Sequence, residues 1–516
     1  MGDGYHKSGC RNQKEAIHTN SPRRETQVAL LVAILFFYLA FVFLRSKRLH
    51  HVPGPWLSKV SELHLAIWDW KLCRNDRILQ WHRDHGPIVR VAPNEVSVAT
   101  MDAVRQVYGT SSRWEKSTYF DHFMGYNERS MFATKAYHEH QKLRRLTSSF
   151  YQATSVFRRP EVEARIRDRV HAVLKYIHQR QEDETDVYNL ADWYAIDNIT
   201  HLILGPAHCT QSIEQPGFER QILQELKELQ IWGPVQLRFP MLFDLVSRPL
   251  SAFFPRLQYI KANDHLSDWC YRLFSTAIED PSLRNSYSLV RHLVEAKQDS
   301  YINTTAIAAE VLDNINAAEA TVAVTATYFI WRLSQSPHWQ RRLRDELRTL
   351  ATQSDGLSSF SDVHLHAPIL EACLKEVYRL HPASSGRAER IVPPEGCTLS
   401  GVYLPAGTVV TSSIVAIHRE PGLFPFPEHF LPGRWLQGDA AEGKARDAHL
   451  IPFGFGGRIC LGKPLATMEI KLLIAGLYLQ YESLLGPHTT PESMKQCSTH
   501  DAVPRALKCL VQFRRL

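Results

Sequence analysis

One segment of the chain is apolar on every face. Residues 28–44 read VALLVAILFFYLAFVFL and contain no charged side chain. As a helix, this segment would span about 26 Å, close to the ~30 Å hydrocarbon core of a bilayer. A cleaved signal peptide would need small residues after it, but Arg45, Lys47 and Arg48 follow instead. We therefore expect one membrane crossing, with a tail at 1–25, an anchor and basic flank at 26–48, and a large folded domain at 49–516 on the cytoplasmic side of the membrane.

The remaining pattern is mostly helical. Residues 86–98 alternate apolar and polar around a turn signal, which predicts a strand pair. A long helix is predicted from Asn303–Thr304, with the threonine as a possible cap, to Ser336–Pro337, and a second from Pro368 to Leu380. Gly and Pro residues within 397–410 predict a hairpin. The expected fold is mainly α with a smaller β region.

Composition narrows the class of protein only modestly. The chain has 516 residues, 44% of them hydrophobic and 22% charged, which is enough for a large core. Nine cysteines without regular spacing argue against a secreted disulfide framework. A net charge of +7 is too small to indicate nucleic acid binding, and it suits an acidic protein partner or an anionic membrane surface.

A glycine-rich loop near the C-terminus presents a single cysteine, Cys460, before an apolar, helix-prone stretch. Backbone N–H groups at a helix start and the nearby Arg458 would stabilise its thiolate. One thiolate cannot build a structural zinc site, but it suffices as the axial ligand of a haem iron. Gly456 and Gly462 would let the backbone approach a flat macrocycle, and Arg458 could meet a propionate. The alternative is a buried structural cysteine after a tight turn.

These residues resemble the cytochrome P-450 superfamily of haem-thiolate monooxygenases, and fungal microsomal members most of all. The matching pattern comprises Phe453, Gly456, Arg458, Cys460 and Gly462. The resemblance implies haem b (iron protoporphyrin IX) as cofactor, with Cys460 as the axial ligand of its iron, and oxygen insertion into an apolar small molecule of fungal secondary metabolism. It also implies electrons from NADPH through a flavoprotein reductase, with cytochrome b5 as a further donor. The location implied is the endoplasmic reticulum membrane, with a luminal tail and a cytosol-facing enzyme.

The same resemblance assigns roles to residues outside the loop. Arg144 takes the place of a propionate-binding arginine, with His140 where the family usually has tryptophan. Arg390, three residues before Pro393, fits a second propionate-binding arginine. The family's structural Glu-Arg-Arg triad is matched at Glu376, Arg379 and Arg434.

The middle of the long helix, Asn314 to Thr321, resembles the family's oxygen-binding stretch, in which an acid and an alcohol deliver protons. In one register Glu319 is the acid and Thr321 a displaced alcohol; in the other, Thr321 is the main alcohol and Ala320 stands where the acid should be. We favour the first register. The alternative for both residues is a threonine bonded to its own backbone and a glutamate in solvent.

Two other functions remain open from the sequence. A haem-thiolate isomerase or dehydratase would need neither a reductase nor protons, and Ala320 is compatible with it. A non-catalytic haem sensor or electron carrier would normally have a second axial ligand, which is not visible. The sequence contains no Rossmann glycine pattern or flavin motif, so electrons must come from another protein.

Overall fold

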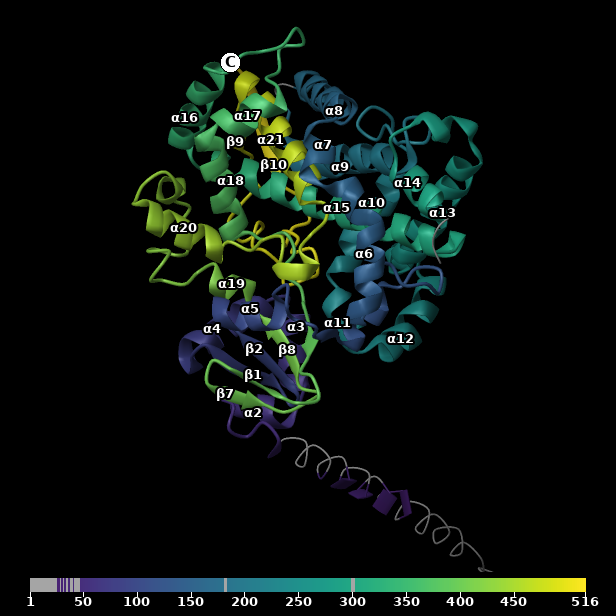
Figure 1. Cartoon of the computed structure of the whole chain (residues 1–516), viewed down its shortest axis with the longest axis vertical. Coiled ribbons are helices and arrows are strands. Elements are labelled where there is room, and N and C mark those ends of the chain that lie inside the picture. The colour runs from purple at the N-terminus through teal and green to yellow at the C-terminus, as the bar shows by residue number, and fades with distance from the viewer. Residues whose placement is uncertain are drawn as a thin grey trace, which may run out of the picture.

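The computed structural model describes residues 47–516 except 181–182 and 298–301, together with scattered positions between 26 and 40. Helices form most of the molecule, and a sheet lies at the end where the described chain begins (Figure 1). The predicted α-rich fold is therefore confirmed. Within the described residues, no helix is both long and apolar enough to cross a membrane. The predicted tail at 1–25 lies outside these residues, and the predicted span at 28–44 lies largely outside them.

The main sheet has five strands in the order β1-β2-β8-β5-β3. Their bounds are β1 Ile88–Ala92, β2 Glu95–Val98, β3 Glu115–Lys116, β5 Arg390–Ile391 and β8 Val409–Ser412. Strands β1 and β2 pair antiparallel with Ile88 opposite Val98, so the predicted strand pair is confirmed. Lys116 pairs with Arg390 across β3 and β5, which places two cations side by side at the sheet edge.

The predicted hairpin at 397–410 is correct only in its first part. Strands β6 (Cys397–Leu399) and β7 (Val402–Leu404) form an antiparallel pair. The next strand, β8, leaves this pair and runs parallel to β2 in the main sheet. A third sheet joins β4 (Thr185–Asp186), β10 (Leu510–Arg515) and β9 (Tyr481–Leu485).

The long central helix, α15, spans Thr304–Ser334. Its cap is Asn303, whose side chain accepts from the Ala306 amide at 2.7 Å, so the cap expected at Thr304 lies one residue earlier. Pro337 begins the next helix, α16 (Pro337–Arg348), so α15 ends just before this proline, as the sequence predicts. Helix α18 runs from Pro368 to Leu380, the predicted bounds, because proline is tolerated at its first position.

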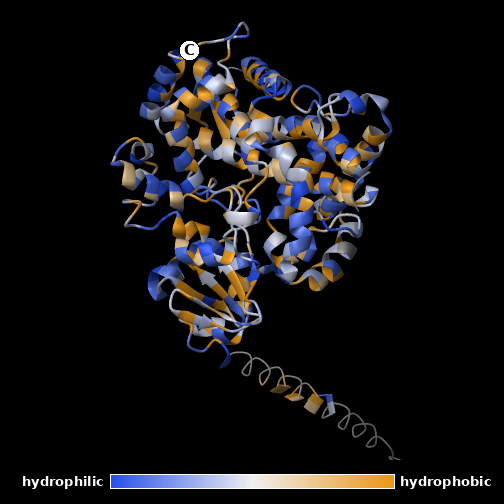
Figure 2. Ribbon diagram, viewed as in Figure 1, coloured by the Kyte–Doolittle hydropathy of each residue, from blue (hydrophilic) through white to orange (hydrophobic). Residues whose placement is uncertain are grey.

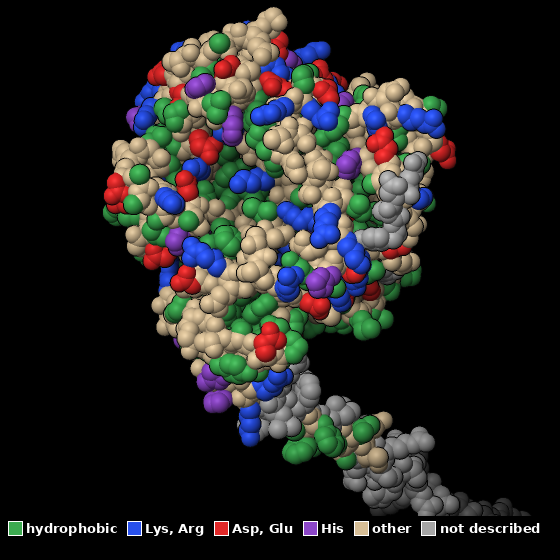
Figure 3. All heavy atoms as spheres, in the orientation of Figure 1, with side chains coloured by type: hydrophobic (Ala, Val, Ile, Leu, Met, Phe, Trp, Pro, Cys, Tyr) green, Lys and Arg blue, Asp and Glu red, His purple; other side chains and the backbone are tan. Residues whose placement is uncertain are grey.

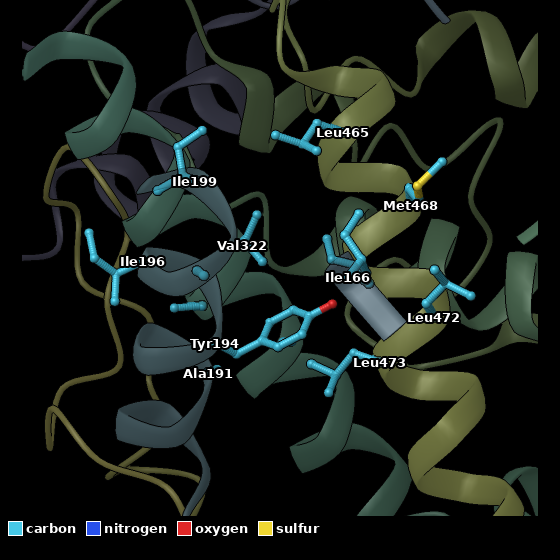
Figure 4. Packing of buried hydrophobic residues seen from close by; sticks show 14 of the residues in the cluster. Ile166, Ala191, Tyr194, Ile196, Ile199, Val322, Leu465, Met468, Leu472 and Leu473 are labelled. Atoms are coloured by element: carbon cyan, nitrogen blue, oxygen red, sulfur yellow. The ribbon is translucent and has the colours of Figure 1, made fainter. Parts of the chain in front are cut away.

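The core forms where α15 packs against α9 (Val187–Leu204), with α8 (Pro160–His178) and α21 (Lys463–Gln480) beside them. Figure 4 shows side chains of these helices, with Tyr194, Ile166 and Leu473 close together between α9 and α21. The hydroxyl of Tyr194 donates to the Glu469 carbonyl at 2.9 Å, which satisfies a polar group inside the core.

The remaining helices complete the molecule. Near the sheet lie α2 Trp56–Val60, α3 Leu63–Trp70, α4 Arg74–His85, α5 Met101–Tyr108, η1 Thr118–Phe123 and α19 Ile414–Ile417. The helical part adds α6 Tyr137–Tyr151, α7 Ala153–Phe157, α10 Phe218–Gln230, α11 Gly233–Arg238, α12 Pro240–Phe253, η2 Pro255–Lys261, α13 Ala262–Glu279, η3 Pro281–Asn285, α14 Leu289–Lys297, α17 Phe360–His366, η4 Pro432–Trp435, α20 Ala440–His449 and η5 Gly456–Arg458. Hydrophilic and hydrophobic residues are interspersed along most of these helices (Figure 2).

Candidate functional site

Cys460 lies between η5 and the start of α21, in a loop fixed by its own backbone. The Cys460 amide donates to the Phe453 carbonyl at 2.9 Å, and the amides of Gly462 and Lys463 face the thiol. Desolvation by the surrounding protein raises the pKa of the Cys460 thiol, yet the residue is exposed to solvent. We infer from both observations that Cys460 borders an open space inside the molecule, which we call the hollow. A thiol in this position can bind a metal ion held in that hollow.

The two loop glycines are needed for different reasons. Gly456 has φ +70°, and a Cβ atom there would come 2.0 Å from the Tyr108 carbonyl oxygen at the end of α5. Only glycine fits such an approach. Gly462 has φ −73°, and its nearest neighbour would be the Cys460 Sγ at 3.9 Å, so it leaves room beside the thiol.

A group of basic side chains surrounds the same hollow, and we call it the cation cradle. Its members are Lys116, His140, Arg144, Arg390 and Arg458. Among the described residues, none of the five has a carboxylate partner within 4.0 Å. The cradle's lysine and arginines donate only to carbonyl oxygens, as Arg144 does to Ile459 at 2.9 Å and Arg458 does to Trp114 at 3.0 Å.

The pKa shifts in the cradle show that the neighbouring carboxylates do not balance its positive charges. Burial and the neighbouring Arg390 lower the pKa of Arg458 to about 9. Burial, followed by Lys116 and the arginines, lowers the pKa of His140 to about 2. Arg458 Nε and His140 Nδ1 are buried without hydrogen-bond partners. Cations packed this closely need negative charge from a ligand, and two carboxylates beside a thiolate-bound metal would supply it.

Helix α15 forms the opposite side of the hollow. Ala317 is exposed and Thr321 is half-buried, although both lie in the middle of a helix that the molecule surrounds. The Thr321 hydroxyl donates to the Ala317 carbonyl at 2.8 Å. Small side chains on this face leave space for a flat group between α15 and Cys460. The donor set and the space therefore fit a haem with its two propionates.

Glu319 does not face this hollow with Thr321. Residues two apart on an α-helix project about 200° apart, so the two side chains lie on different faces of α15. Burial raises the pKa of Glu319 well above its usual value, and its charged neighbours are Asp192, Asp501 and Lys227. The predicted pairing of Glu319 and Thr321 as acid and alcohol is not what this geometry provides.

Two other carboxyl groups, which sequence reasoning missed, lie on the Thr321 side of α15. Asp313 is one turn before Ala317, and burial raises its pKa to about 6. Burial and then Asp313 raise the pKa of Glu310 to about 8. Glu310 accepts from the Met131 amide at 2.5 Å, which ties the loop before α6 to the helix. The sequence offers one signal for this placement. Asp313 lies four residues before Ala317 and Glu310 four residues before Asn314, a spacing that puts each pair on one face of the helix.

The triad residues meet in the structure. Arg379 Nη2 and Glu376 Oε1 are 2.8 Å apart, and Arg434 Nε lies 3.2 Å from the same oxygen. Trp435 Nε1 donates to Glu376 Oε2 at 2.9 Å. Arg379 also donates to the carbonyl of His429 at 3.0 Å, so α18 holds the segment that precedes the cysteine loop. Phe453 packs edge-on against Tyr378 of α18, with ring centroids 5.2 Å apart.

Comparison with known proteins decides the family. The family described as cytochrome P450 matches residues 65–505. The chain belongs to the cytochrome P450 family. It is 35% identical to "Cytochrome P450 monooxygenase FGM1" of Gibberella zeae, over 94% of this chain and 97% of the relative. It is also 27% identical to "Cytochrome P450 monooxygenase orf2" of Aspergillus niger, over 82% and 84% of the two chains. "Cytochrome P450 monooxygenase AKT7" of Alternaria alternata shares 26% identity, over 88% of each.

As a cytochrome P450, the protein is a haem-binding oxidoreductase of the monooxygenase class, acting with a redox partner on a small molecule. The structure brings Cys460, Arg144, Arg390 and Arg458 together around one hollow. Two members of the cation cradle could not be assigned to the site from the sequence. Lys116 has no sequence signal at all, and His140 was left in doubt because histidine replaces the usual tryptophan.

Proposed function

We propose that the protein inserts one oxygen atom of dioxygen into a C–H bond of an apolar small molecule, and that Cys460 would bind the iron of the haem it uses. The other oxygen atom leaves as water, with two electrons from NADPH and two protons. Bound haem would supply dioxygen activation, which thiolate donation favours. The observation that supports this most strongly is an accessible thiol facing the same hollow as the cation cradle, which has no anionic partner.

The chain's own groups would divide the remaining work. Arg144, Arg390, Arg458 and Lys116 would bind the haem carboxylates, and these negative charges would raise the lowered pKa values of the four side chains. The Thr321 hydroxyl, which can exchange its donor bond to Ala317 for one to a water, would move protons into the hollow. Glu376, Arg379 and Arg434 would keep the cysteine loop in register without touching the reacting atoms.

Electrons would come from NADPH through a flavoprotein reductase, with cytochrome b5 as a second donor. Three basic side chains near the cysteine loop are exposed: Lys142 and Arg145 on α6, and Lys463 on α21. The hydrogen bond from Arg144 of α6 to the Ile459 carbonyl joins α6 to this loop. Lys and Arg side chains gather near the middle of the face seen in Figure 3. Such a basic surface suits an acidic donor protein. The fungal relatives support a substrate from fungal secondary metabolism.

We further propose that the protein is anchored in the endoplasmic reticulum membrane by residues 28–44, with 1–25 luminal and a catalytic domain at 49–516 facing the cytosol. Large apolar side chains are exposed on α2, α3 and α12: Trp56 70%, Trp70 66%, Met241 87%, Leu245 74% and Phe253 80%. Helices α3 and α11 contact each other, and α2 and α12 lie at the end of the molecule where the described chain starts (Figure 1). We call α2, α3 and α12 the apolar surface. Exposed apolar side chains in such number favour partial burial of this surface in the bilayer.

The test is product formation with purified full-length protein, reductase, NADPH and dioxygen, using extracts of a deletion strain as the source of accumulated substrate. We expect a product heavier by one oxygen atom, labelled when ¹⁸O₂ is used. Turnover without NADPH or dioxygen would establish the haem-thiolate isomerase or dehydratase instead. A reduced protein that binds haem but not carbon monoxide would indicate a capped iron and a sensor or carrier.

A further inference from the structure

A pocket of about 370 Å³ lies at the C-terminal end of α15, apart from the hollow. Trp331, which lines it, is ten residues beyond Thr321 on α15, or about 15 Å along the helix. The described residues that line this pocket include neither Cys460 nor any member of the cation cradle. Its volume is in the range of sites that bind small molecules. We call it the second pocket.

Segments that are far apart in the sequence form the second pocket. They are the start of α4, the ends of α15 and α18, and the segments 415–419 and 491–498. Hydrogen bonds fix these segments against one another. The Asn75 amide donates to Ser498 Oγ at 2.9 Å, and the Tyr328 hydroxyl donates to the Met494 carbonyl at 3.0 Å. The walls of the pocket are therefore held in place before any ligand binds.

Buried lining residues of the second pocket are largely apolar. Trp331, Leu380 and Met494 are each no more than 4% exposed. Gln335 and Lys495, in contrast, are exposed and polar, and they mark the side that opens to solvent. A ligand with an apolar body would bury that body against the first group of side chains.

Most charged side chains at the second pocket already have an oppositely charged partner. Three ion pairs account for them: Asp76 with Lys495 at 3.6 Å, Arg419 with Glu428 at 2.9 Å, and Glu492 with Arg505. These groups therefore carry little unbalanced charge into the pocket.

Arg332 is the exception. Its Nε donates to His381 Nε2 at 2.9 Å and its Nη1 donates to Gln335 Oε1 at 3.4 Å. Neither acceptor is an anion, because burial and then Arg332 lower the pKa of His381 well below its usual value. Among the residues that the structure describes, Arg332 has no carboxylate partner, and its Nη2 makes no hydrogen bond. The guanidinium lies 4.3 Å from the centroid of the Trp331 ring, which fixes its position.

The lining of the second pocket thus combines one guanidinium without an anion and a buried apolar wall. Burial lowers the pKa of Arg332 to about 10, as expected for a cation that has left water without gaining a negative partner. A carboxylate would supply that partner, since pairs of arginine and carboxylate are among the strongest hydrogen-bonded contacts in proteins.

We propose that the second pocket binds an aliphatic carboxylate, whose anionic end accepts from Arg332 and whose chain lies against Leu380, Val415 and Met494. The proposal does not depend on the proposed function, because the pocket is separate from the hollow. Such a ligand would join α15 and α18 to the segment 491–498, so it should raise the melting temperature of the protein.

The experiment measures the binding of octanoate by calorimetry. The protein is full-length and haem-loaded, and it is saturated with 4-phenylimidazole, which binds haem iron and occupies the hollow. We expect saturable binding to the wild type. Arg332→Gln should raise the Kd at least tenfold, because one charge-assisted pair is lost. Octanamide, which has the same chain without the charge, should bind the wild type at least tenfold more weakly than octanoate does.

Arg342→Gln is the matched control. Arg342 of α16 is also half-buried, and its guanidinium lies 4.5 Å from the centroid of a tryptophan ring, that of Trp339, but it does not line the pocket. Its Kd for octanoate should stay within twofold of wild type.

Gln335→Trp tests the pocket without removing the arginine. Gln335 is exposed, so the larger side chain should be tolerated, fill the opening and raise the Kd at least tenfold. Kd values of Arg332→Gln and Gln335→Trp that match Arg342→Gln, or no saturable binding to the wild type, would overturn the proposal. The thiolate spectrum of the carbon monoxide complex tests the proposed function separately.

Discussion

At the scale of single residues, the most direct prediction concerns Cys460. Replacing it with serine removes the soft donor that the loop amides stabilise, and a neutral hydroxyl is a poor substitute. We expect the Cys460→Ser protein to lose the red-shifted Soret band of thiolate ligation in its reduced, carbon monoxide-bound form. Cys397→Ser, at a half-buried cysteine of β6, is the control and should keep the band. An unaltered spectrum from Cys460→Ser would show that another residue binds iron.

Thr321 and Glu319 should behave differently in turnover. Thr321 borders the hollow, so Thr321→Val should lower product formed per NADPH consumed by about tenfold or more and release hydrogen peroxide instead. Glu319→Gln keeps the shape and the neutral state of a side chain that faces Asp192, so its coupling should stay within about twofold of wild type. The measurement is product, NADPH and peroxide in one assay. A large fall in product formed per NADPH consumed in Glu319→Gln would support the acid role predicted for Glu319 from the sequence.

The limits of sequence reasoning are clearest at these residues. The glycine-rich loop is local, so its spacing alone pointed to Cys460 and Arg458. The direction of Glu319 depends on which face of α15 meets α9 and α10, and both candidate faces carry small residues. Lys116 reaches the cradle only because β3 pairs with β5, which lies over 270 positions later in the chain. Contacts of this kind leave no short-range pattern.

At the scale of elements, Glu376, Arg379 and Arg434 hold α18 to η4. Arg379 and Glu376 are fully buried, so Arg379→Ala would leave a carboxylate without its main partner at a cost of about 3–5 kcal/mol. We expect little haem-loaded protein and a lower melting temperature by circular dichroism. Arg105→Ala breaks the 2.8 Å pair with Asp102, in which both side chains are exposed, and should cost less than about 1 kcal/mol. A stable Arg379→Ala protein with normal haem content would contradict a structural role.

Elements bounded by strong local signals could be predicted from the sequence. Pro368 and His381–Pro382 delimit α18, and Pro337 ends the run of α15. The cap of α15 was missed by one residue because Asn303 and Thr304 are both good capping residues. The strand β8 was assigned to a hairpin because its parallel partner β2 lies more than 300 residues earlier. Local turn signals cannot specify a pairing over that distance.

At the scale of the whole molecule, the apolar surface should contribute to membrane binding beyond the anchor. Deleting residues 1–48 should leave haem binding intact and lower, but not abolish, sedimentation with anionic vesicles. Adding Leu245→Ser and Phe253→Ser should lower the remaining binding by at least about tenfold, since each large apolar side chain contributes about 1.5–3 kcal/mol when buried.

The control for this experiment is Leu365→Ser, at an equally exposed leucine of α17 that lies outside the apolar surface. Its vesicle binding should match that of the truncated protein. If the truncated protein with Leu245→Ser and Phe253→Ser binds vesicles as well as the truncated protein alone, α12 does not enter the bilayer. Loss of haem on truncation would show that residues 1–48 belong to the catalytic fold.

The cation cradle also has a consequence for the life of the protein in the cell. Until haem arrives, Arg144, Arg390, Arg458 and Lys116 repel one another without a ligand anion between them, so the newly made chain is less stable than the haem-loaded protein. Binding of the porphyrin pulls the folding equilibrium forward by mass action and shields the chain from proteases. The amount of enzyme that accumulates in a cell should then fall when haem is scarce, even at a constant level of its messenger RNA.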